Sequence, residues 1–75
     1  MYAMFSELNG ELKYLGSFVA QDRNRDALKI RGEWFRQSDG LPAKEGTSRR
    51  YIRRKDALSE RERALVALGP IGVVQ

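Results

Sequence analysis

The chain has 75 residues, of which 41% are apolar and 32% charged, and its 14 Lys and Arg against 10 Asp and Glu give a net charge of +4. It contains no Cys and no His, which excludes disulfides, the usual zinc sites and nucleophilic catalysis through either residue. The length predicts one domain, and the basic composition is compatible with nucleic acid, an anionic surface or an acidic protein as partner.

The N-terminal segment has no basic region followed by an apolar run, so no signal peptide is expected. No apolar stretch approaches the roughly 20 residues that are needed to span a bilayer. We therefore expect no membrane contact and a cytoplasmic location.

Residues 2–20 predict a β-hairpin, because Asn9-Gly10 between two apolar runs favours a two-residue type I′ turn. A turn of this length pairs Leu8 with Glu11, Phe5 with Tyr14, Met4 with Leu15, and Gly16 with Ala3. One face then carries the core residues Ala3, Phe5, Leu12, Tyr14 and Phe18. The other carries Tyr2, Met4, Leu15 and Val19, which is too apolar for a fully solvated face, so another element should cover part of it. A glycine late in a strand also allows close approach of a neighbour, or a β-bulge.

Residues 22–37 predict an amphipathic helix with Asp22 as its N-cap. Its apolar side would carry Ala27, Leu28, Ile30, Trp34 and Phe35. Trp34 is expected in the core, with a stacking platform as the less favoured role. Arg31 lies in the middle of the apolar arc, where its stem could pack along the core, its charge could pair with a carboxylate such as Glu7, or it could serve a partner.

Residues 38–46 predict a loop, and residues 47–54 predict a third strand. Alternation puts Arg49, Tyr51 and Arg53 on one face of this strand and Arg50, Ile52 and Arg54 on the other. Neither face is uniformly apolar, which indicates an edge strand whose charges also discourage unwanted strand pairing.

Residues 57–68, approximately, predict a second helix. Ser59-Glu60-Arg61-Glu62 has the spacing of a capping box, with Asp56 as a competing cap, and Gly69-Pro70 ends the helix. Residues 69–75 form an apolar tail. The order is ββαβα, an α+β domain in which two helices pack on one face of a small antiparallel sheet.

Beyond the excluded Cys and His chemistry, no Ser, Thr or carboxylate stands in a recognisable catalytic pattern, and no glycine-rich phosphate loop is present. We expect a non-enzymatic protein without catalytic residues, metal or cofactor.

The main functional candidate is the basic segment 49–55, which places five cations within seven residues. It contributes +5, so the other 68 residues sum to −1. Arg predominates, and its planar guanidinium suits bidentate contacts with phosphates and also with carboxylates. We expect nucleic acid, DNA or RNA, to bind the segment, with Tyr51 stacking on a base or packing. The candidate residues are Arg49, Arg50, Tyr51, Arg53, Arg54 and Lys55.

A second hypothesis is a small inhibitor, adaptor or assembly subunit that binds an acidic protein. Its contact surface would be the basic edge, the second hairpin face or the tail residues Ile71, Val73 and Val74. In size and composition the chain resembles the small proteins that phages encode to bind host machinery. A homodimer that pairs exposed surfaces across a two-fold axis fits either hypothesis.

The run Leu15-Gly16-Ser17-Phe18-Val19-Ala20, followed by Asp22 and Ala27-Leu28, is similar to the hairpin-to-helix turn of the B subunits of phenylacetyl-CoA epoxidase. These subunits are non-catalytic assembly proteins. The resemblance covers about a fifth of the chain and requires a shift of one residue. It implies a helix after the hairpin, and we transfer no function from it.

Overall fold

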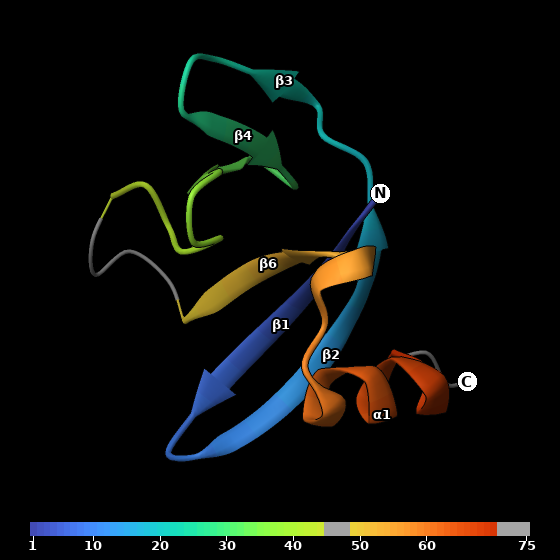
Figure 1. The fold of residues 1–75 in the computed structure, drawn as a ribbon. Coiled ribbons are helices and arrows are strands. Elements are labelled where there is room, and N and C mark those ends of the chain that lie inside the picture. The colour runs from blue at the N-terminus through green and yellow to red at the C-terminus, as the bar shows by residue number, and fades with distance from the viewer. Residues whose placement is uncertain (45–48, 71–75) are drawn as a thin grey trace.

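The computed structural model describes residues 1–44 and 49–70, which form two three-stranded antiparallel sheets and one α-helix (Figure 1). The first sheet has the order β2-β1-β6, with β1 at Tyr2–Leu8, β2 at Glu11–Phe18 and β6 at Arg50–Arg54. The second has the order β3-β4-β5, with β3 at Asp22–Arg23, β4 at Ala27–Ile30 and β5 at Glu33–Arg36. A 3₁₀ turn, η1, spans Lys55–Ala57, and α1 spans Glu60–Leu68. The α+β class holds, but the described residues contain one α-helix and a 3₁₀ turn rather than two helices.

The predicted hairpin is confirmed. Asn9 and Gly10 have φ of 54° and 81°, as a type I′ turn requires, and Leu8 pairs with Glu11. Further from the turn the predicted register is wrong, because a β-bulge between Met4 and Phe5 makes Met4 pair with Gly16. The bulge was one of the two roles expected for this glycine, whose φ of 127° few side chains tolerate.

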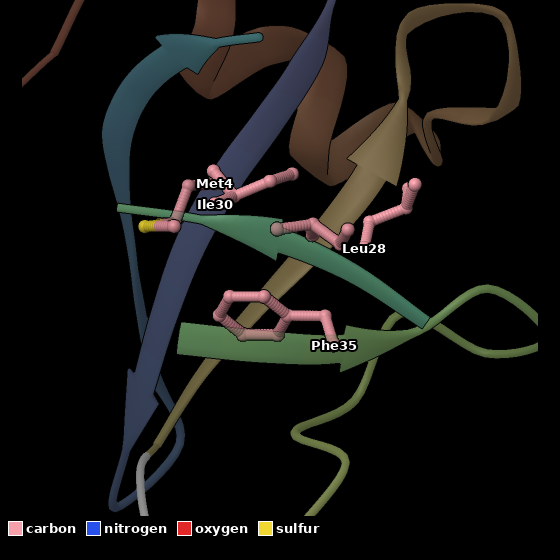
Figure 2. Packing of buried hydrophobic residues seen from close by; sticks show 5 residues of the cluster. Met4, Leu28, Ile30 and Phe35 are labelled. Carbon is pink, nitrogen blue, oxygen red and sulfur yellow. The ribbon is translucent and has the colours of Figure 1, made fainter. Parts of the chain in front are cut away.

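Both faces of the first sheet are covered. Ala3, Phe5, Tyr14 and Tyr51 form a buried cluster on one face, against Leu58 and the α1 residues Leu65 and Val66. Met4 and Ile52 on the other face join Leu28, Ile30 and Phe35 of the second sheet. Figure 2 shows Met4 with the three side chains of the second sheet, between the strands. The bulge moves Phe18 to this second cluster. The expectation that another element covers the second hairpin face is therefore confirmed.

The helix predicted over 22–37 is wrong, since this segment contains β3, β4 and β5. Arg31 and Gly32 have φ of 53° and 80°, the values of a second type I′ turn, and they connect β4 directly to β5. Asp22 is no helix cap, because it lies in β3 and pairs with Lys29. The helix implied by the epoxidase resemblance is absent from this segment for the same reason.

The spacing of apolar residues in segment 22–37 led to a wrong prediction because it fits both the helical period and the strand period. Leu28 and Ile30 lie two residues apart and face inward with Phe35, as a strand requires, yet the same residues also share one side of a helical wheel. Arg31 did not fit among the apolar residues of the predicted helix because it is in fact a turn residue. Its guanidinium carbon lies 4.8 Å from the centroid of the Phe18 ring, a cation–π contact.

The third strand occupies the edge of its sheet, as predicted, and residues 47 and 48 of the predicted range lie outside the described part. On its outer side the Ile52 amide donates to the Gly40 carbonyl at 2.9 Å, so the loop partly covers the edge. The second predicted helix is present as α1. Ser59, not Asp56, is its N-cap, and the capping box with Glu62 is complete. The apolar tail, with Ile71, Val73 and Val74, lies outside the described residues.

Candidate nucleic-acid interface

Strand alternation separates the basic segment into parts with different surroundings. Tyr51 belongs to the buried cluster beneath α1, whereas Ile52 belongs to the cluster between the sheets. Their cationic neighbours therefore leave β6 toward different faces and different ends. The five cations do not form one continuous surface.

Tyr51 is a core residue. It is 9% exposed, and its ring stacks on Phe5 with centroids 5.4 Å apart. Its hydroxyl donates to Oε2 of Glu62 at 2.8 Å. Burial, together with the hydrogen bond to the Glu62 carboxylate, raises the pKa of the Tyr51 phenol well above its usual range. Tyr51 was expected either to stack on a base or to pack, and in the structure it packs in the core.

Arg53 supports the same network. Its Nε lies 3.6 Å from Oε2 of Glu62, and its guanidinium carbon lies 4.6 Å from the centroid of the Tyr51 ring. Nη1 also donates to the backbone carbonyl of Asp39 at 2.7 Å. The guanidinium thus ties β6 to both α1 and the loop that follows β5, so it serves the fold.

Arg49 and Arg50 lie at the opposite end of β6 from Arg54. Arg50 donates through Nη2 to Oε1 of Glu33 at 2.8 Å, an ion pair that joins the two sheets. Arg49 is exposed. Because a strand advances about 3.3 Å per residue, Arg50 and Arg54 are separated by about 13 Å. The structure does not bring these two ends together.

Arg54 and Lys55 instead join cations from other elements around a basic cleft. The cleft consists of two adjoining hollows of about 750 Å³ and 560 Å³ that share Tyr2, Arg23 and Arg54. Its functional groups come from β1, β3, the end of β5 and β6 with η1, and we define the basic cleft by Tyr2, Arg23, Arg36, Arg53, Arg54 and Lys55.

The cleft has a positive balance of charge. Five cationic side chains line it against the two carboxylates of Asp39 and Asp56, which leaves +3. Asp39 neutralises Arg36 through two hydrogen bonds, at 3.2 and 2.8 Å. The Leu41 amide and this guanidinium hold the pKa of the Asp39 carboxyl below its usual value. Because Arg36 pairs with Asp39 and Arg53 pairs with Glu62, three of the five cations remain for a ligand, namely Arg23, Arg54 and Lys55.

These three differ in how freely they can bind. Arg54 donates to Asp56 at 3.2 Å, but both side chains are 71% exposed. An ion pair this accessible to water contributes little stability. Within residues 1–44 and 49–70, the side chains of Arg23 and Lys55 have no hydrogen-bond or ion-pair partner. A phosphate could therefore contact all three without breaking a buried interaction.

Sequence reasoning missed Tyr2, Arg23 and Arg36 as site residues. The predicted helix placed Arg36 on its polar side and gave Arg23 no role, and the hairpin pattern gave Tyr2 no role beyond apolar cover. No local signal links them to Arg54, because they meet only through the pairing of β1 with β6 and the packing of the two sheets. The sequence shows the charge or aromatic character of these residues, but it does not show that they lie near Arg54.

Trp34 departs from the prediction that it lies in the core. It is half-buried, belongs to neither buried cluster and pairs with Lys29 across the second sheet. With Arg31, Glu33 and Arg50 it lines a separate hollow of about 670 Å³.

Among residues 1–44 and 49–70, no three carboxylates come together in a way that could hold a metal ion. No helix in that same part of the chain is long and apolar enough to cross a membrane. Comparisons with protein-family models, with curated proteins and with solved structures gave no match.

Proposed function

We propose that this protein is a non-enzymatic module that binds nucleic acid through the basic cleft. The observation that supports the proposal is the convergence of Arg23, Arg54 and Lys55, from three separate elements, around the basic cleft, whose side chains sum to a charge of +3. Cations gathered in a concave surface concentrate the field at one place and favour a polyanion. Arg23 lies far from Arg54 and Lys55 in the sequence, so the convergence depends on the fold and not on the basic segment alone.

Each cation has a distinct part in the proposal. Arg23 and Arg54 offer planar guanidinium groups, which bind phosphate oxygens through two parallel hydrogen bonds. Lys55 adds a compact charge at the second hollow. Arg53 and Arg36 shape the wall, because their donors already serve Glu62 and Asp39. The proposal thus moves the binding role from the whole segment 49–55 to its C-terminal end.

The test is the salt dependence of binding to fluorescent single- and double-stranded DNA and RNA. Three phosphate contacts should reduce affinity about 20- to 40-fold between about 50 and about 200 mM salt. The variant Arg23→Gln/Arg54→Gln/Lys55→Gln should bind more weakly, and each lost contact should lower the salt slope by about 1.

A charge-matched variant provides the control. Lys13→Gln/Lys29→Gln/Arg63→Gln also removes three positive charges, from positions that do not line either hollow. It should keep the salt slope of the parent protein. Equal loss in both triple variants would show that only net charge matters, and would overturn the cleft as the binding site. Failure of the parent protein to bind any of the four nucleic acids at low salt would overturn the function, and an acidic protein partner would be sought instead.

A further inference from the structure

Tyr2 occupies the boundary between the two hollows of the basic cleft. It is one of three residues that line both, and the other two are Arg23 and Arg54. Tyr2 pairs with Arg54 across β1 and β6, whereas Arg23 approaches from the second sheet. An aromatic residue therefore lines the same cleft as cations supplied by two different sheets.

The ring is held in place but only half-buried. One part packs against the cluster of Met4, Leu28, Ile30, Phe35 and Ile52, and the remainder faces the cleft. Because its position is fixed by the core, little conformational entropy is lost when a flat ring stacks on it. Stacking of a base on an aromatic side chain stabilises single-stranded complexes and tolerates any base sequence.

The shape of the site also distinguishes between kinds of nucleic acid. Duplex DNA is read by an element that protrudes into its groove, commonly a helix or a two-stranded ribbon. Neither of these elements is cationic here: the hairpin carries Glu7 and Glu11 beside its turn, and in α1 Glu60 and Glu62 alternate with Arg61 and Arg63. The surface with a net positive charge is the hollow cleft. A hollow admits a strand whose bases are not already paired.

We infer that the ligand is single-stranded nucleic acid, with a base stacked on Tyr2 and the flanking phosphates held by Arg23 and Arg54. The inference rests on the proposed function, and it names the class of nucleic acid that the same cleft takes. It assigns Tyr2 the aromatic role that the sequence suggested for Tyr51.

The experiment compares two single-stranded probes of about 8 nucleotides, an oligothymidylate and an abasic strand of equal length with the same phosphates. The parent protein should bind oligothymidylate about 5- to 150-fold more tightly than the abasic strand, which corresponds to the loss of one stacked base. Tyr2→Leu, which keeps apolar packing, should bind both probes alike. Tyr2→Phe, which keeps the ring, should retain the discrimination of the parent protein.

The outcomes separate this inference from the proposed function. Equal binding of both probes by the parent protein, with a salt slope that the cleft triple variant still lowers, would overturn the stacking role and leave the phosphate site intact. Tighter binding of a duplex of the same length would overturn the preference for a single strand. Because the two probes are compared within each variant and differ only in their bases, a general loss of affinity in Tyr2→Leu does not hide a loss of discrimination.

Discussion

The hydroxyl of Tyr51 lies 2.8 Å from Oε2 of Glu62 and donates a hydrogen bond to it. The other oxygen of the same carboxylate accepts from the Ser59 amide at 2.9 Å. One buried acid thus completes the N-cap of α1 and fixes the helix to β6. The residue at the centre of the basic segment is therefore a structural residue, and the cations beside it divide between the fold and the cleft.

Tyr51→Phe should destabilise the protein without altering the cleft. It removes a donor from a charged carboxylate that is 6% exposed, a loss that typically costs about 1.5–3 kcal/mol. Chemical denaturation should detect the change, and nucleic-acid affinity of the folded variant should be unchanged. Tyr2→Phe deletes the same atom at a position where the described structure gives the hydroxyl no hydrogen bond, and its stability should match that of the parent protein. Similar losses in the two variants would contradict the buried network.

Gly40→Ala should be far more damaging than Gly32→Ala, although both glycines have φ near 80°. A Cβ at Gly40 would lie 2.0 Å from the Ile52 carbonyl oxygen, whereas one at Gly32 meets nothing within 4 Å. Gly32→Ala should therefore cost only the backbone strain of about 1 kcal/mol. Gly40→Ala must also push the loop away from β6, so thermal unfolding should begin well below that of Gly32→Ala. Equal midpoints would contradict the close approach of this loop.

Asp39 should make stability fall in acid. Its folded-state pKa lies below its ordinary value of 3.8 because the Leu41 amide and the Arg36 guanidinium stabilise the carboxylate. A depressed pKa means that the contribution is complete above pH 3.8 and is lost as the pH falls toward the folded value. Denaturation midpoints measured across this range should decline less steeply in Asp39→Asn than in the parent protein. A variant with the same acid slope would show that the carboxylate is not held in this way.

The hairpin and α1 could be predicted from sequence because local chemistry determines them. Asn9-Gly10 specifies a tight turn, and Ser59 with Glu62 specifies a helix start; neither depends on distant contacts. The position of the bulge was harder to predict, since Gly16 is its only mark in the sequence. Predictions from sequence were therefore reliable where specific turn or cap residues determine the local structure.

The second sheet could not be predicted because its connection has weaker turn chemistry. Arg31 takes a positive φ that arginine seldom adopts, and strands of four residues or fewer are too short to show a clear alternation. Gly32 was the one signal against a helix, since glycine disfavours a helix interior. Packing against Met4 and Ile52, rather than local propensity, selects the strands.

The candidate site was predicted in part. Charge density singled out the segment around β6, but alternation and pairing decide which of its cations face the cleft. Arg23 and Tyr2 lie far from Arg54 in the sequence and become its neighbours only in the folded chain. A site assembled from three elements leaves no continuous motif.

The most direct test of the basic cleft is a titration of the isotopically labelled protein with single-stranded oligonucleotide, followed by amide chemical shifts. We predict that the largest changes occur at Tyr2, Arg23, Arg54 and Lys55, with smaller ones along the neighbouring loop at Ser38. Residues at the other end of β6, including Arg50, should respond little. Changes centred on Arg49 and Arg50, or on the hollow beside Trp34, would contradict the assignment of the nucleic-acid site to the cleft.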